Sequence, residues 1–139
     1  MMVARLDMGK ARRPRTRRSL ASSQSFESFV IDQLADVGDI VARRMFGGAG
    51  LYCAGLFIGI IARDVLYLKV DAENLPEVRA AGARPFRPYA DRPSSMKYYS
   101  VPVGILESAP ELVKWARRAI RAAQRARRPP TSDARESDD

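Results

Sequence analysis

Apolar residues recur at helical spacing over residues 25–38 of the chain. The series is Phe26, Phe29, Val30, Gln33, Leu34 and Val37. Positions i, i+3, i+4 and i+7 lie on one face of a helix, so this pattern predicts a helix with one buried side. Ser25 stands where an N-cap is expected, and Gly38 stands where a left-handed residue would end the helix.

Between residues 40 and 70 the composition changes to β-branched and aromatic residues punctuated by glycine, which is typical of short strands. We expect four strands in an antiparallel meander, at 41–46, 51–53, 56–62 and 65–70. Their connections are short enough to require antiparallel neighbours, and they are Gly47-Gly48-Ala49-Gly50, Ala54-Gly55 and Arg63-Asp64. Strand 56–62 is apolar at both parities, which predicts a central strand covered on both faces. Gly59 within it indicates a bulge or close packing against a helix.

The remaining third of the chain predicts two helices and a last strand. Residues 72–81 suggest a short helix with Asp71 as cap and Gly82 as stop, although Pro76 would strain its fifth position. The proline-rich segment 84–93 predicts a loop or a broken edge strand, and residues 96–101 predict the last strand. Ser108 and Glu111 form a capping box that opens a final helix. The apolar face of that helix is Leu112, Trp115, Ala116, Ala119, Ile120 and Ala123.

These elements together predict an α+β fold, in which an antiparallel sheet of about five strands in a meander carries packed N-terminal and C-terminal helices. The charge pattern adds domain limits. The net charge is +8, but residues 1–20 hold seven Arg or Lys against one Asp, and residues 110–128 hold seven against one Glu. We expect a disordered basic arm over 1–22, a folded domain over 23–127 and a disordered acidic tail over 128–139.

The composition excludes several chemistries. The chain has no histidine and one cysteine, Cys53, so it holds no histidine-based triad, no intrachain disulfide and no paired-cysteine metal site. The glycine run at 47–50 continues into a strand rather than a helix, which argues against a phosphate-binding loop. We expect no enzyme, no cofactor and no small-molecule ligand. No apolar run approaches the length of a membrane span, and we expect a cytoplasmic protein.

Basic side chains are the candidate functional residues. A stripe along one face of the final helix, at spacings of four, three and four, is able to follow a phosphate backbone together with the basic arm. The candidate nucleic-acid residues are Arg12, Arg13, Arg15, Arg17, Arg18, Lys114, Arg118, Arg121 and Arg125. A basic helix face is also an ordinary solvated face, and this alternative stays open. Of Arg43 and Arg44, which point to opposite faces of a strand, one is expected to pair with a carboxylate such as Asp64 or Asp71.

Five segments in a fixed order carry a resemblance to a known family. They are Arg43–Tyr52, Asp64–Asp71, Gly82 with Pro85-Phe86, Ser95–Tyr99 with Val101-Pro102, and Trp115-Ala116. In this order and spacing they resemble the N-terminal domain of the TfoX/Sxy family over residues 24–126. The motif residues are Arg44, Met45, Phe46, Gly47, Gly48, Gly50, Tyr67, Lys69, Met96, Tyr98 and Tyr99.

Members of that family are bacterial regulators of natural competence, and the resemblance implies an antiparallel sheet with packed helices, no cofactor and no established catalytic residue. The second, C-terminal domain of the best-known members has no counterpart in this sequence, so we expect a stand-alone form. The predicted function is a non-enzymatic regulatory protein that associates with DNA, or with a DNA-bound transcription regulator, through its basic termini. The alternative is a self-associating interaction module, such as a homodimer, with no direct nucleic-acid binding.

Overall fold

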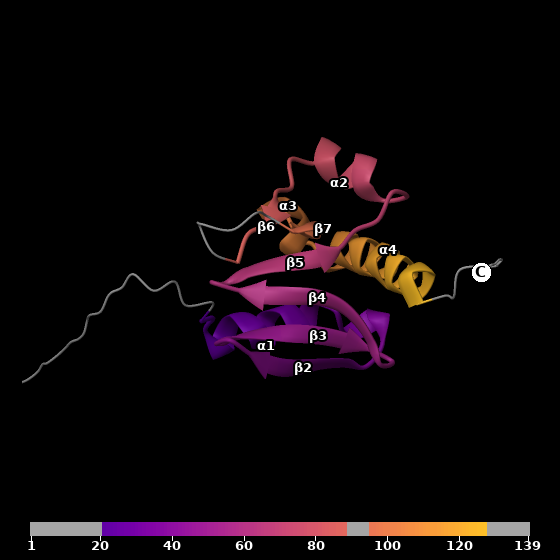
Figure 1. The fold of residues 1–139 in the computed structure, drawn as a ribbon. Helices are drawn as coiled ribbons and strands as arrows, with labels where there is room; N and C mark the ends of the chain where they lie inside the picture. Colours follow the sequence, from indigo (N-terminus) through magenta and orange to yellow (C-terminus); the bar gives the residue numbers. More distant parts are fainter. Residues whose placement is uncertain (1–20, 89–94, 128–139) are drawn as a thin grey trace, which may run out of the picture.

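One antiparallel sheet organises the part of the chain that the computed structural model describes, which is residues 21–88 and 95–127 (Figure 1). Its strands lie in the order β2-β3-β4-β5-β7-β6. The strands are β2 Ile40–Met45, β3 Gly48–Cys53, β4 Leu56–Ala62, β5 Val65–Lys69, β6 Pro85–Phe86 and β7 Ser95–Ser100. The helices are α1 Gln24–Gln33, the 3₁₀ turn η1 Ala35–Val37, α2 Leu75–Ala80, α3 Val103–Leu106 and α4 Ala109–Arg127. The predicted α+β meander with helices at both ends is confirmed.

Three consecutive two-residue turns join β2 to β5. Their φ angles are 53° and 87° at Phe46 and Gly47, 51° and 80° at Ala54 and Gly55, and 52° and 58° at Arg63 and Asp64. Positive φ at both central residues is the requirement of the type I′ turn, whose twist matches that of antiparallel strands. The predicted connection over residues 47–50 is wrong, because residues 48–50 pair with β2 inside the sheet.

Two glycines within the strands lie where a side chain has no room. A Cβ on Gly50 would lie 2.7 Å from Cε of Met45 and 2.7 Å from Cε1 of Phe57. A Cβ on Gly59 would lie 2.6 Å from the main-chain oxygen of Tyr67 on β5. The register between β3 and β4 also shifts beside Gly59, so the predicted bulge is confirmed. The close approach, however, is to the neighbouring strand rather than to a helix.

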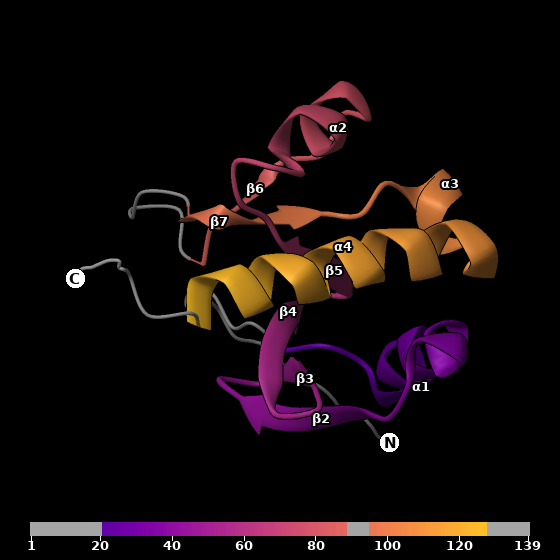
Figure 2. The same ribbon diagram turned by 90° about the vertical axis from the view of Figure 1, so that its right-hand side faces the viewer.

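Helix α4 covers one face of the sheet, crossing β4 and β5 (Figure 2). Its buried side chains are Leu112, Trp115, Ala116, Ala119, Ala122 and Ala123. All of them except Ala122 share one core cluster with Ile58, Ile61, Leu66 and Leu68 of the sheet. The predicted apolar face is therefore confirmed, with Ile120 partly buried and Ala122 added to it.

The opposite face of the sheet carries a smaller cluster of its own. Ala62 and Phe86 are buried there, and Ile60, Tyr67 and Tyr98 pack against them. Strand β4 is thus central and apolar on both faces, as its sequence predicts. Side chains of the strands themselves cover this second face, which we call the open face. It is turned toward the viewer in Figure 1, where β2 to β5 lie in front of α1.

The ends of two helices differ from the prediction. Ser23, not Ser25, caps α1, because its hydroxyl accepts from the amide of Phe26 at 3.1 Å. The helix ends at Gln33, and η1 extends the segment to Gly38, whose φ is 139°. Helix α2 begins at Leu75 rather than residue 72. Pro76 then lies in the first turn, where a missing amide costs no hydrogen bond.

Gly82 ends α2 as predicted, with φ of 87°. Its amide donates to the Arg79 carbonyl at 3.0 Å, and the amide of Ala83 donates to the Val78 carbonyl at 3.2 Å. This pair of bonds is the Schellman motif, in which a left-handed residue allows the last carbonyls of a helix to find donors. The proline-rich segment contains the short edge strand β6, and its residues 89–93 lie outside the described residues.

Only half of the predicted capping box at α4 forms. The Ser108 hydroxyl accepts from the amide of Glu111 at 3.4 Å, as predicted. The amide of Ser108, however, donates to the carbonyl of Ile105 in α3 at 3.1 Å. The Glu111 carboxylate therefore has no capping donor to bind and accepts from Lys114 instead.

Gly59→Ala tests the close approach of β4 and β5. The added methyl meets a main-chain oxygen, which cannot rotate away, so we expect the free energy of unfolding to fall by about 1–3 kcal/mol. The matched control is Gly104→Ala in α3, where a Cβ meets nothing within 4 Å. We expect that variant to be as stable as the parent or more stable by up to about 1 kcal/mol in urea unfolding. Equal stability of the two variants would contradict the close approach.

Candidate nucleic-acid interface

The described residues hold the helical half of the predicted basic surface. Arg12, Arg13, Arg15, Arg17 and Arg18 of the arm lie outside them. Lys114, Arg118, Arg121 and Arg125 all lie on α4. Of the nine predicted cations, the structure therefore places the four on α4.

Three of those four cations bind carboxylates of the same chain. Lys114 lies 3.1 Å from Oε2 of Glu111, three residues earlier on the helix. Arg118 binds Glu77 of α2, and Arg125 binds Asp71 at the end of β5. A phosphate would have to compete with each carboxylate, so the predicted stripe presents much less free charge than its residue count suggests.

The bond between Arg125 and Asp71 has bidentate geometry. Nε of Arg125 lies 2.6 Å from Oδ2 of Asp71, and Nη2 lies 2.9 Å from Oδ1. These hydrogen bonds hold the pKa of Asp71 below its ordinary value, and the amide of Glu73 adds to the effect. They also raise the pKa of Arg125. This pair ties the last turns of α4 to the β5 end of the sheet.

Three other cations of α4 have no carboxylate partner within the described part of the chain. Arg121 and Arg127 are exposed. Arg117 is exposed as well, and its guanidinium donates at 3.0 Å to a main-chain oxygen, that of Asp36. Arg117 and Arg121 are four residues apart and so share a helix face. Arg117 and Arg127 were not part of the predicted stripe. Which arginines meet a carboxylate depends on how α4 is rotated about its axis on the sheet, and the spacing of the residues does not reveal that rotation.

A second group of cations lies on the open face, beside three aromatic rings. Arg43 of β2 stands 5.6 Å from the ring centroid of Tyr52, which in turn lies 5.1 Å from that of Phe57. The Phe57 ring lies 5.7 Å from that of Tyr98, and Nζ of Lys69 stands 5.1 Å from the Tyr98 ring. We call these five residues the aromatic row. It brings side chains from five strands into one line of contacts.

Two hollows border the aromatic row. One, of about 240 Å³, is lined by Phe57, Tyr98, Lys69 and Arg127, together with the β3–β4 turn. The other, of about 290 Å³, is lined by Val41, Arg43, Tyr52 and Gly55. Neither hollow has an Asp or Glu among its described lining residues. This part of the surface is therefore both aromatic and positive.

Partial burial affects the titrating groups of the row. It lowers the pKa of Lys69, and Lys97 lowers it further, while Asp71 partly offsets both effects. Burial also raises the pKa of Tyr98. Because the ammonium of Lys69 has lost part of its hydration, an anion bound beside it would gain more than it would at a fully solvated lysine.

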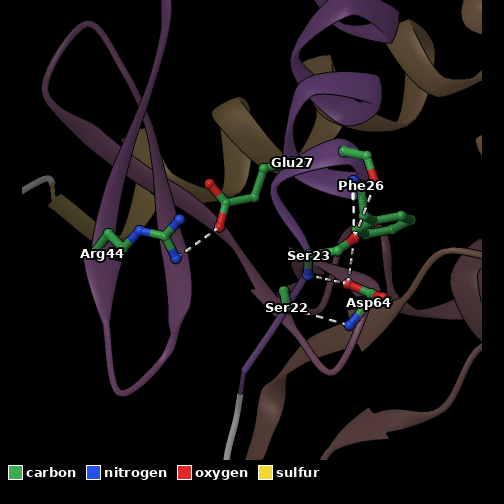
Figure 3. A network of polar contacts seen from close by, with 7 residues as sticks. Ser22, Ser23, Phe26, Glu27, Arg44 and Asp64 are labelled. Carbon is green, nitrogen blue, oxygen red and sulfur yellow. Dashed lines mark hydrogen bonds and ion pairs between the residues drawn. The ribbon is translucent and has the colours of Figure 1, made fainter. Parts of the chain in front are cut away.

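Polar contacts fix the start of α1 against two turns of the sheet (Figure 3). The carboxylate of Asp64 accepts from the amide of Ser23 at 2.7 Å, and the amide of Asp64 donates to the Ser22 hydroxyl at 3.1 Å. Arg44 lies 3.4 Å from the buried carboxylate of Glu27. One of the two arginines was expected to pair with a carboxylate, and Arg44 does so, but its partner is Glu27 because Asp64 is engaged here and Asp71 binds Arg125.

Several alternatives to a nucleic-acid surface find no support in the described residues. They contain no cluster of three His, Cys, Asp or Glu side chains that would hold a metal ion. No helix among them has the length and apolar character of a membrane span. Cys53 is a partly exposed thiol that packs against the main core.

The fold and this surface define an α+β domain with a helical layer on one face of its sheet and an aromatic, positive open face on the other. The sequence profile of the TfoX N-terminal domain matches residues 32–123 of the chain. The chain belongs to the TfoX N-terminal domain family, and the resemblance seen in its motifs is confirmed. A search of proteins with curated function finds no match.

The family motif residues fall into separate parts of the fold. Tyr98, Lys69 and Gly50 belong to the open face, where Gly50 leaves room for Met45 and Phe57. Tyr67 contacts the Phe86 ring edge to face, Tyr99 is buried in the main core, and Phe46 is exposed in its turn. Gly47 lies in the first turn, Gly48 opens β3, and Met96 lies in β7. The open face was not predicted as a site.

Asp71→Asn tests the contribution of the Asp71–Arg125 pair through its pH dependence. Because the native-state pKa of Asp71 is lowered, the pair stabilises the native state above the ordinary carboxyl pKa of about 4. That contribution is lost as the pH falls through the lowered pKa. We expect the variant to melt at a lower temperature than the parent at pH 7, with the difference shrinking below about pH 4. Asp32→Asn, at an exposed site on α1, serves as the control. An equal difference at both pH values would contradict the assignment.

Proposed function

We propose that this domain is a non-enzymatic, cytoplasmic regulatory protein that associates with duplex DNA, or with a DNA-bound transcription regulator, by sequence-independent contacts to phosphates. Membership of the TfoX N-terminal domain family supports a regulatory role related to competence. The observation that carries the DNA contact is that Arg117, Arg121 and Arg127 of α4 lack carboxylate partners among the described residues.

The position of these cations supports contact with an extended polyanion. Arg127 ends α4 as the structure describes it, and the next residue in the sequence is another arginine, Arg128. The basic arm contributes a second positive segment. Phosphate contacts from such segments fix a protein on DNA without reading its sequence, because they do not touch base edges. The partner is therefore the phosphate backbone rather than one particular operator.

The test is the salt dependence of binding to a labelled duplex, measured by fluorescence anisotropy. Each phosphate contact contributes about 0.9 to the slope of log affinity against log salt. We expect Arg121→Glu with Arg127→Glu to reduce that slope by about 2, because two contacts are lost. Deletion of residues 1–18 should reduce it separately. Arg118 and Arg125 are unsuitable for reversal, since their replacement strands Glu77 and Asp71.

The control is Arg79→Glu, an exposed cation on α2, which should bind DNA as the parent does. All variants should melt at the parent temperature. If the parent protein does not bind duplex DNA at low salt, or if the double reversal binds as well as the parent, direct DNA contact is wrong.

Self-association is a second candidate function, favoured by the edge strand β2. Among the described residues this strand has a neighbour on one side only, so its other side offers main-chain donors and acceptors for pairing with another strand. Val41 within it is 51% exposed, and Phe46 in the following turn is 77% exposed. If two copies pair along β2, the parent should be a dimer in light scattering, and Val41→Glu should make it a monomer. A monomeric parent at high concentration would exclude this function.

A further inference from the structure

The aromatic row lies on the open face of the sheet, and one of its hollows reaches the last turns of α4 at Ala123, Ala126 and Arg127. Its three rings contact one another edge to face or at a tilt, with centroids between 5.1 and 5.7 Å apart. Arg43 stands beside the Tyr52 ring, and Lys69 stands beside the Tyr98 ring. All three rings are half-buried, so each keeps part of its surface in contact with solvent.

We propose that the aromatic row is a binding site for single-stranded nucleic acid, in which the rings of Tyr52, Phe57 and Tyr98 stack on bases while Arg43, Lys69 and Arg127 contact phosphates. The site is separate from the α4 surface assigned to duplex DNA, although Arg127 borders both. It does not depend on the duplex contact, and either site can exist without the other.

The charge of the surface selects a polyanion over other partners. Both hollows are lined by cations and contain no carboxylate among their described lining residues. The cations of the hollows, unlike Arg118 and Arg125 on the helical side, form no ion pair with a carboxylate among the described residues. An acidic strand is thus the complementary occupant, whereas an apolar protein surface would strand Lys69 and Arg43 without solvent or counter-charge.

The aromatic rings select a single strand over a duplex. In a duplex each base is stacked between its neighbours, and its ring faces cannot reach a protein side chain. A single strand exposes them, and proteins that bind single strands combine a positive groove with aromatic residues that stack on successive bases. The row has this combination, and its two hollows both reach Gly55 in the turn between β3 and β4.

The room for the row depends on Gly50. A Cβ at this position would lie 2.7 Å from Cε of Met45 and Cε1 of Phe57, and 3.5 Å from Cε1 of Tyr52. Without that methyl group the rings lie close over the strand rather than standing away from it. The rings therefore lie close against the strands, from Tyr52 of β3 across to Tyr98 of β7.

The experiment compares three probes of about 12 nucleotides by fluorescence anisotropy with the full chain: oligo(dT), an abasic oligonucleotide with the same phosphates, and a duplex. We expect oligo(dT) to bind the parent at least about tenfold more tightly than the abasic strand, because stacking needs bases. Tyr52→Leu with Tyr98→Leu should remove this preference while leaving binding of the abasic strand unchanged. Leucine keeps the apolar packing but has no ring face.

Matched controls separate stacking from charge and from misfolding. Phe29→Leu removes an exposed aromatic ring on α1 and should keep the preference for oligo(dT). Lys69→Gln should weaken oligo(dT) and abasic binding alike and reduce the salt slope by about 0.7, and Arg79→Gln should not. Trp115 lies on the buried face of α4, and its fluorescence reports whether each variant keeps its core.

The outcomes distinguish this site from the duplex contact. Equal affinity for oligo(dT) and the abasic strand, or an equal loss in Phe29→Leu, would overturn the single-strand site whatever the duplex does. Loss of duplex binding in the α4 variants with the oligo(dT) preference retained would support it. Tighter binding of oligo(rU) than of oligo(dT), removed by the same tyrosine changes, would also support it and would assign the site to RNA.

Discussion

The packing of α4 against β4 and β5 is the interaction on which the rest of the structure depends. Leu112 and Trp115 anchor the helix, and a run of buried alanines lets its backbone approach the sheet closely. Because this face is fixed, the rotation of every other side chain on the helix is fixed as well. Arg118 and Arg125 must then point toward α2 and the end of β5, where Glu77 and Asp71 receive them.

The same constraint explains why counting cations overstates the positive potential of α4. Helix α4 carries six basic residues against one acidic residue, but the fold brings Glu77 and Asp71 to it from positions 41 and 54 residues away in the chain. The cations of α4 that meet no carboxylate among the described residues are Arg117, Arg121 and Arg127. They are set by packing, because the buried face decides which arginines meet a carboxylate and which meet solvent.

Local signals in the sequence predicted the strands and most turns. They did not predict contacts between segments that lie far apart in the chain. The turns Ala54-Gly55 and Arg63-Asp64 could be predicted because each pair interrupts two apolar runs. The first turn was predicted at the wrong residues. Three glycines lie close together there, and positive φ was expected at them rather than at Phe46, because few non-glycine residues adopt it. The family resemblance could be seen in the order of the motifs. The aromatic row could not be predicted, since Tyr98 reaches Phe57 only when β7 adds to the sheet beside β5.

With the described helices packed on one face, the sheet must cover its other face with its own side chains. Large aromatic residues do this most effectively, because each ring shields two or more neighbouring positions, and edge-to-face contacts stabilise the cluster. Rings that protect a sheet in this way keep one side toward solvent, which an apolar core residue does not. Cations placed over those rings, as Arg43 and Lys69 are, gain from the ring electrons and also hold positive charge at the surface. The open face therefore combines its own stabilisation with the two features, ring surface and charge, that recognition of an anionic aromatic polymer requires.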